Sequence, residues 1–126
     1  MNTLLILAAT TLPFNLVCTG LISESATRFR SKPIRSEYRL DLNQGIFCRD
    51  DCDQIQQIFS VTDLTITLEN VRWGEGPSTV VQTVINRESG EYNRLFRSGV
   101  GGFVEVGTCE RAPFTGFPER KVERKF

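Results

Sequence analysis

Short segments in which apolar and polar residues alternate, separated by turn residues, constrain the fold of this chain more than any other feature. In EYRLDL (37–42) three apolar side chains alternate with charged ones, as in a strand with one buried face. DLTITLEN (63–70) repeats the pattern, and TVVQTVIN (79–86) is rich in the β-branched residues that strands favour. No long stretch shows the spacing of an amphipathic helix. The pattern therefore predicts an all-β chain.

The connections between these segments predict the topology. RESG (87–90) is followed by EYNRLFRS (91–98), and SGVGG (98–102) precedes FVEVGTC (103–109). Glycine-containing connections of this length join neighbouring antiparallel strands. We therefore expect a small antiparallel meander that closes as a barrel or as a two-layer sandwich. DQIQQIFS (53–60) fits a short strand of the same sheet.

Four cysteines add a second constraint, since they can staple the sheet with disulfides. They are Cys18, Cys48, Cys52 and Cys109. In an oxidising compartment four cysteines form two bridges, for which three pairings exist. Cys48 and Cys52 are close enough to bridge through a turn, which leaves Cys18 to join Cys109 across the domain. In the loop-entropy account the long bridge contributes about 4.6 kcal/mol and the short one about 2 kcal/mol.

The segment FCRDDC (47–52) also resembles metal and redox motifs. Zinc prefers four nitrogen or sulfur ligands, and no second cysteine pair or histidine completes such a set. The spacing of the aspartates does not follow that of a calcium-binding loop. A thioredoxin-type motif has two residues between its cysteines, whereas this one has three. A structural disulfide in an acidic turn is the favoured interpretation, and we expect no metal or other cofactor.

The N-terminal segment bears on the compartment. No charged side chain precedes Glu24, and an apolar run occupies residues 4–12. This run resembles the hydrophobic region of a secretory signal peptide, and it is too short to span a bilayer stably. Residues 1–20 are therefore either a signal peptide or in part a first strand, and cleavage after Gly20 would discard Cys18. The expected localisation is periplasmic or extracellular.

Composition divides the rest of the chain into three parts. Residues 21–36 are polar and rich in Ser and Arg, which predicts a linker or loop. Residues 37–111 hold the alternating segments and form the expected β domain. Residues 112–126 are expected to be a tail that wraps the surface, with Phe114 and Phe117 covering one end of the barrel.

The composition also disfavours several classes of function. Fifteen basic residues balance fifteen acidic ones, so no net charge draws the chain to nucleic acid. The chain has no histidine, the commonest general base and a usual zinc ligand. Four glutamates fall on expected solvent faces or turns, and none forms a pair placed like a glycosidase acid and base: Glu69, Glu88, Glu91 and Glu105. We predict no catalytic residue.

Trp73 is the candidate contact residue. It is the only tryptophan, and it begins the Gly/Pro-rich stretch 73–77 between two expected strands. A tryptophan in such a loop can contact a ligand or a partner protein. It can equally fold back and cover the core, as large aromatic residues usually do. The sequence leaves both alternatives open.

Several pieces of the chain resemble an uncharacterised family of small secreted bacterial proteins. They are LVCTG (16–20), YRLDLNQGIFCRDDC (38–52), INRESGEY (85–92), GTC (107–109) and APFTGFP (112–118). They follow one another from near the start to near the end of the chain, and APFTGFP is the most specific of them. The resemblance implies a secreted or periplasmic β protein that keeps Cys18 in the fold, with LVCTG as its first strand. It implies no biochemical activity.

These observations predict an exported, disulfide-stabilised binding or structural module that is not an enzyme. One alternative is a lipocalin-like carrier, with a small apolar ligand in the mouth of the barrel. Another is a carboxylate-based hydrolase, which no motif supports. The expected partner is accordingly a small apolar ligand or a protein. A pocket lined by Phe and Leu would favour the carrier, whereas a filled core beside an exposed Trp73 would favour the module.

Overall fold

A computed structural model describes residues 11–24, 30–73 and 79–119, and these residues form strands and connections without any helix. Accordingly, no described segment is a helix long and apolar enough to cross a membrane. The strands are β1 (Phe14–Glu24), β2 (Ser31–Asp41), β3 (Ile46–Arg49), β4 (Gln56–Gln57), β5 (Ser60–Val61), β6 (Thr65–Trp73), β7 (Thr79–Asn86), β8 (Glu91–Ser98) and β9 (Gly101–Pro113).

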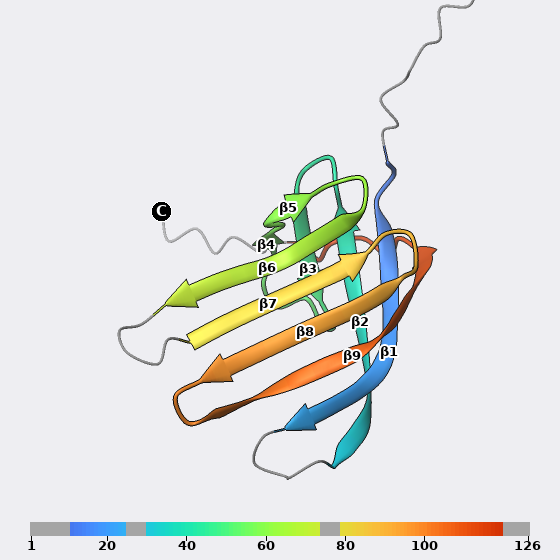
Figure 1. Cartoon of the computed structure of the whole chain (residues 1–126). Helices are drawn as coiled ribbons and strands as arrows, with labels where there is room; N and C mark the ends of the chain where they lie inside the picture. The colour runs from blue at the N-terminus through green and yellow to red at the C-terminus, as the bar shows by residue number, and fades with distance from the viewer. Residues whose placement is uncertain (1–10, 25–29, 74–78, 120–126) are drawn as a thin grey trace, which may run out of the picture.

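All strands belong to one antiparallel sheet in the order β4-β3-β2-β1-β9-β8-β7-β6-β5. The sheet curls into a half-barrel in which β1, β2 and β3 form one wall and β6, β7 and β8 cross in front of it as the other (Figure 1). β4 and β5 lie at opposite edges of the sheet, yet only residues 58–59 separate them in the chain. The predicted all-β antiparallel meander is confirmed, with a single curled sheet. The strand expected over residues 53–60 is divided into these two short edge strands.

The first and last strands hold the sheet together. Every residue of β1 pairs with β9, and Cys18 lies directly opposite Cys109. These two cysteines form a disulfide across the pair, with Cα atoms 3.9 Å apart. Two positions further along β1, Gly20 lies opposite Gly107, and a Cβ atom at Gly20 would overlap the carbonyl oxygen of Val106. Glycine is therefore required at this position, because the partner backbone leaves no room for a Cβ atom.

Within residues 21–36, expected to be a linker, residues 21–24 and 31–36 instead extend two strands of the sheet. β1 continues to Glu24 and β2 begins at Ser31, with the ladder reaching the pair Ser23–Ser31. The side-chain oxygens of these two serines lie 2.8 Å apart. Polar side chains do not prevent strand pairing when they are exposed to solvent, because the hydrogen bonds between the strands come from the main chain. The β structure thus begins at Phe14 rather than at residue 37.

The hydrophobic core lies between the two walls, at the end of the half-barrel where β3 and β6 are joined through β4 and β5. Cross-strand register places Leu40 opposite Phe47 on one wall, and Ile85 opposite both Ile66 and Tyr92 on the other. The core cluster is made of Phe14, Leu16, Cys18, Tyr38, Leu40, Phe47, Ile66, Leu68, Ile85 and Tyr92. These side chains pack together at this end, beside a hollow of about 360 Å³ that Phe14, Leu16, Ile66 and Ile85 help to line.

The tail binds the outer face of the first wall. Asn15 is fully buried there, and its amide nitrogen donates to the hydroxyl of Thr115 at 2.9 Å and to the carboxylate of Glu37 at 2.8 Å. Arg39 donates to the carbonyl oxygen of Gly116 at 2.8 Å. The part of the tail described, up to residue 119, therefore lies on the convex face of β1 and β2.

The segment FCRDDC closes a tight turn after β3. Cys48 and Cys52 form the second disulfide, with Cα atoms 4.9 Å apart. Asp50 and Cys52 both have φ near +55°, at 53° and 55°, a left-handed conformation that non-glycine residues rarely adopt. The main-chain nitrogen of Asp50 donates to the carbonyl oxygen of Glu37 at 2.7 Å. The short disulfide therefore shapes a strained turn that is pinned to β2.

We predict that the two disulfides differ in their contribution to stability. Cys109→Ser should lower the free energy of unfolding by about 2–5 kcal/mol, because it opens a loop spanning 91 residues. The double variant Cys48→Ser/Cys52→Ser should lose less, because its loop spans 4 residues. Denaturant unfolding of the three proteins measures the difference. Equal losses would contradict the ranking.

Candidate functional site

Four polar side chains line up across the concave face of the second wall and the adjoining strand β9. Register places Glu69, Thr83, Arg94 and Glu105 at consecutive cross-strand positions on β6, β7, β8 and β9. The Thr83 hydroxyl donates to Glu69 Oε2 at 3.1 Å. Arg94 Nη1 donates to Glu105 Oε2 at 2.9 Å, and Arg94 Nε lies 3.8 Å from Glu69 Oε2. We call these four residues the polar row.

Glu105 is fully buried, which corrects the expectation that it faces solvent. The alternation in FVEVG suggested that its valines point inward, but Val104 and Val106 are 41% and 45% exposed. The reason is Arg94, which lies directly opposite Glu105 in the β8–β9 hairpin and neutralises its charge inside. Glu69 is also partly enclosed rather than on a solvent face.

Arg49 connects the two walls. From the end of β3 its Nη2 lies 4.0 Å from Glu105 Oε2, and the same atom donates to the hydroxyl of Ser36 at 3.3 Å. Its guanidinium carbon also lies 6.0 Å from the centre of the Tyr38 ring, within the range of a cation–π contact. Glu105 therefore has an arginine from each wall beside it.

Two buried tyrosines lie close to these charges. Their hydroxyls, and Glu105 Oε1, have no hydrogen-bond partner within the described part of the chain. Burial raises the pKa of the Tyr38 phenol above its ordinary value, and Arg49 and Arg94 oppose that shift. Burial, and then the Glu105 charge, raise the pKa of the Tyr92 phenol. Both phenols are therefore neutral at physiological pH.

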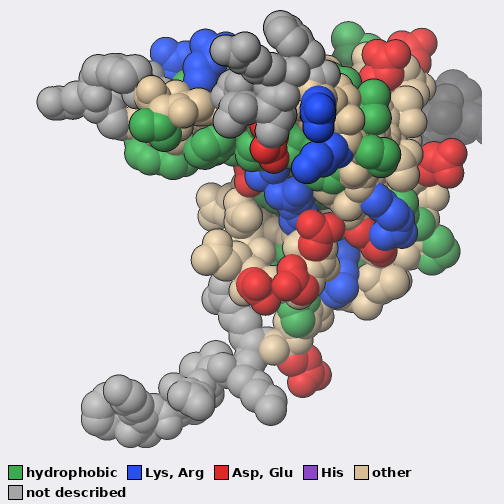
Figure 2. Space-filling model, turned by 90° about the horizontal axis from the view of Figure 1, so that it is seen from below, with side chains coloured by type: hydrophobic (Ala, Val, Ile, Leu, Met, Phe, Trp, Pro, Cys, Tyr) green, Lys and Arg blue, Asp and Glu red, His purple; other side chains and the backbone are tan. Residues whose placement is uncertain are grey.

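Beyond the polar row, the same face becomes apolar. The next cross-strand positions are Val71, Val81, Phe96 and Phe103, which we call the apolar row. The rings of Phe96 and Phe103 stack with centroids 5.5 Å apart. The guanidinium of Arg94 lies 5.1 Å from the centre of the Phe103 ring, so the polar row supports the apolar one. Figure 2 views this open end and shows hydrophobic side chains beside a central group of charged ones.

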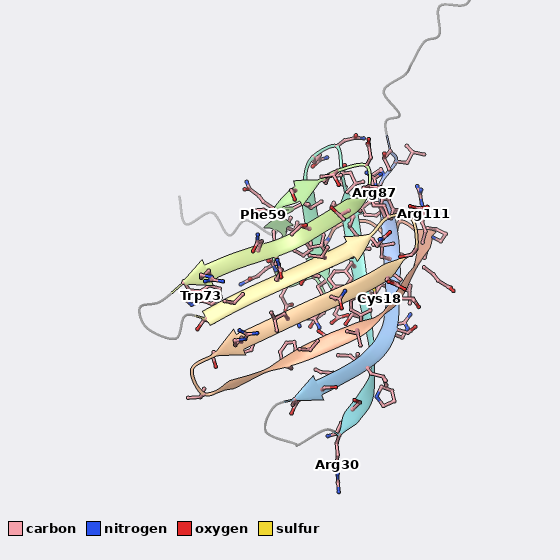
Figure 3. The ribbon with its side chains drawn as sticks, in the orientation of Figure 1. Cys18, Arg30, Phe59, Trp73, Arg87 and Arg111 are labelled. Atoms are coloured by element: carbon pink, nitrogen blue, oxygen red, sulfur yellow. A yellow bond between two sulfur atoms is a disulfide. The ribbon has the colours of Figure 1, made fainter. Side chains whose placement is uncertain are left out.

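Trp73 is the last residue of β6, where it pairs with Thr79. Its side chain is 51% exposed and does not cover the core. Figure 3 shows it at the open end of the second wall, far from Arg87 and Arg111 at the other end. By the alternation of the strand it shares the concave face with Val71. Residues 74–77 of its expected loop lie outside the described residues.

The structure brings together each predicted cysteine pair, but it does not bring Trp73 near them. Because all four thiols are in disulfides, none can serve as a thiolate ligand. Sequence reasoning missed Arg49, Arg94 and Glu105. A signal for the last two existed, because a hairpin that turns at residues 98–101 places these opposite charges directly across from each other.

The polar row and the apolar row offer ion pairs and apolar contacts. Glu105 is engaged by arginines, and the neutral phenols are poor bases. In the stretches that the structure describes, no three His, Cys, Asp or Glu side chains come together in a way that could hold a metal ion. No family model, curated protein or solved structure matches this chain.

We predict that Glu105→Gln lowers the free energy of unfolding by about 3 kcal/mol, because it leaves Arg94 and Arg49 without their buried counter-charge. The matched control is Glu110→Gln on the same strand, where the side chain is exposed and the expected loss is below about 0.5 kcal/mol. Urea unfolding at neutral pH measures both. Similar midpoints for the two variants would show that the buried pair contributes nothing.

We also predict a loss of stability at alkaline pH. The unfolded chain releases its phenolic protons near pH ~10, whereas the raised pKa values of Tyr38 and Tyr92 keep those protons on the folded chain. Above about pH 10 the unfolding free energy should therefore fall by up to about 1.4 kcal/mol per pH unit for each tyrosine. Below that pH this contribution is fully present.

The two tyrosines are the only ones in the chain, so phenolate absorbance reports on them alone. Near pH ~10 the folded protein should show less phenolate than the unfolded chain, and the double variant Tyr38→Phe/Tyr92→Phe should lack this part of the alkaline loss. Phenolate formation at the ordinary pKa in the folded protein would contradict the prediction.

Proposed function

We propose that this chain is an exported, non-catalytic binding module that holds an apolar partner on the concave face, at the apolar row. The observation that carries the proposal is the exposure of apolar side chains on regular strands. Val71 is 47% exposed and Trp73 is 51% exposed, although both belong to a strand paired along its length with β7. Exposed apolar surface rimmed by charged residues is typical of interaction sites.

The polar row supports this proposal because it holds the binding face in place. Arg94, on β8, contacts Glu69 on β6 and both Glu105 and the ring of Phe103 on β9. Side chains that are already ordered lose little conformational entropy when a partner binds. The apolar row is therefore presented on a surface that is organised before binding.

Export is the second part of the proposal. Two disulfides and no free thiol among the cysteines are consistent with folding in an oxidising environment. We infer that the protein works in the periplasm or outside the cell, directed there by the apolar N-terminal run. Cys18 lies in β1, as the first-strand alternative requires, while residues 1–10 lie outside the described residues.

A carrier of a small apolar ligand is the second candidate, and one observation favours it. A hollow of about 590 Å³ at the open end is lined by Phe96 and Phe103, together with Leu95 and Val104. This volume lies in the range of small-molecule sites. Such a ligand would lie in this hollow rather than in the smaller one of about 360 Å³ at the other end, which Arg87 and Arg111 help to line.

The proposal predicts that one charge on the apolar row abolishes binding. In a random-peptide selection with the oxidised protein, the peptides that bind should lose at least about tenfold in affinity for Val71→Asp, because the substitution places a desolvated charge in the contact. The control is Val106→Asp, since Val106 is 45% exposed on the opposite face. Both variants should remain folded.

The proposed surface would be contradicted if Val71→Asp and Val106→Asp weakened binding equally. It would also be contradicted if the selection yielded no peptide. Native mass spectrometry of the exported protein tests the carrier. A small molecule that remains bound, and that is lost from a Phe103→Asp variant, would favour the carrier over the module.

A further inference from the structure

We propose that the outer edge of β6, over residues 69–73, binds an extended strand of a partner protein by main-chain pairing; this inference rests on the binding function proposed above. The outer neighbour of β6 is β5, which pairs only with Ile66 and Thr67. One further main-chain bond runs from Phe59 N to the carbonyl oxygen of Leu68 at 3.2 Å. Among the described residues, the strand beyond Leu68 pairs with β7 alone.

An unpaired strand edge offers a row of main-chain donors and acceptors that a further strand can complete. The sheet has a second such edge at the start of β2, because β3 pairs only with Tyr38–Asp41. That edge carries Lys32 and Pro33, two residues that block strand addition. The edge of β6 has neither lysine nor proline over residues 69–73. Of the two edges, β6 is the one open to a partner strand.

The side chains along this edge define the chemistry of the partner. Val71 and Trp73 share the concave face with the apolar row, so the added strand should place apolar residues on that side. Asn70 and Arg72 are exposed on the convex face, where the row from Arg72 continues through Val80 to Arg97. An acidic residue on that side of the partner, directly opposite Arg72, would complement its charge. The partner is therefore an extended segment in which apolar and acidic residues alternate.

A second copy of this chain does not meet that description. Over residues 69–73 the convex face of β6 carries only Asn70 and Arg72. Antiparallel pairing of two copies keeps like faces together, so Arg72 would lie beside Asn70 or beside the second Arg72. Neither register supplies an acidic group.

Trp73 makes the inference directly measurable, because the only tryptophan lies at the end of this edge. The probe is a synthetic peptide of alternating valine and glutamate. The two control peptides are an isomer with the same residues in two blocks and a peptide of alternating valine and lysine. The alternating valine–glutamate peptide should shift Trp73 emission to shorter wavelength and slow hydrogen exchange of the amides in residues 69–73. Either control peptide should need a concentration at least about tenfold higher to produce the same two effects.

Charge reversal at the edge sharpens the test. Arg72→Glu should lower the affinity for the valine–glutamate peptide about three- to tenfold and raise the affinity for the valine–lysine peptide by a similar factor. The matched control is Arg35→Glu, an exposed arginine on the other free edge, in β2. It should change neither affinity by more than about twofold. Reversed effects, with Arg35→Glu responding and Arg72→Glu not, would overturn the assignment to β6.

Other outcomes separate this inference from the proposed function. If the block isomer binds as well as the alternating peptide, and Val71→Asp still abolishes binding, the proposed function is supported and main-chain pairing at the edge of β6 is contradicted. If no peptide binds and the protein forms a dimer that Val71→Asp dissociates, the occupant is a second copy and the inference is wrong. If selected peptides ignore Val71→Asp, the proposed function itself fails.

Discussion

The pairing of β1 with β9 is the constraint on which the rest of this structure depends. It is the one place where the sheet joins segments from opposite ends of the chain, and it involves every residue of β1. The Cys18–Cys109 disulfide fixes its register, and the facing glycines 20 and 107 let the backbones approach. Without this ladder, β2 and β3 would have no connection to β8 through the sheet, and the two walls would not face each other.

Once the walls face each other, charged side chains become part of the interior. Glu105 is fully buried, and it is tolerated because Arg94 pairs with it along the sheet and Arg49 approaches from the other wall. A buried ion pair returns little net stability, since desolvation offsets its Coulomb energy. Removing either partner, however, would leave the other charge uncompensated inside the protein. The cluster therefore fixes how the walls meet, and it marks where the filled core ends.

The open end follows from the shortness of β5. This strand covers only the start of β6, so the rest of β6 keeps a free edge beside an exposed apolar row. The free edge on β2 is blunted by Pro33, whereas the one on β6 is not. The asymmetry puts the proposed binding surface on one wall. Arg94 joins this surface to the buried cluster, so the part that stabilises the fold also orders the part proposed to bind.

The sequence by itself determined the all-β class, the antiparallel meander and the turns after β7 and β8, because alternation and turn chemistry are local properties of the chain. Cysteine spacing also indicated both disulfides. Which face of a strand is buried was decided only by the tertiary structure. FVEVG has the same alternation whichever side turns inward, and Glu105 became the buried side only because Arg94 and Arg49 meet it there. In the same way, residues 21–24 and the polar residues 31–36 entered strands because β9 and β1 provided the neighbouring backbone.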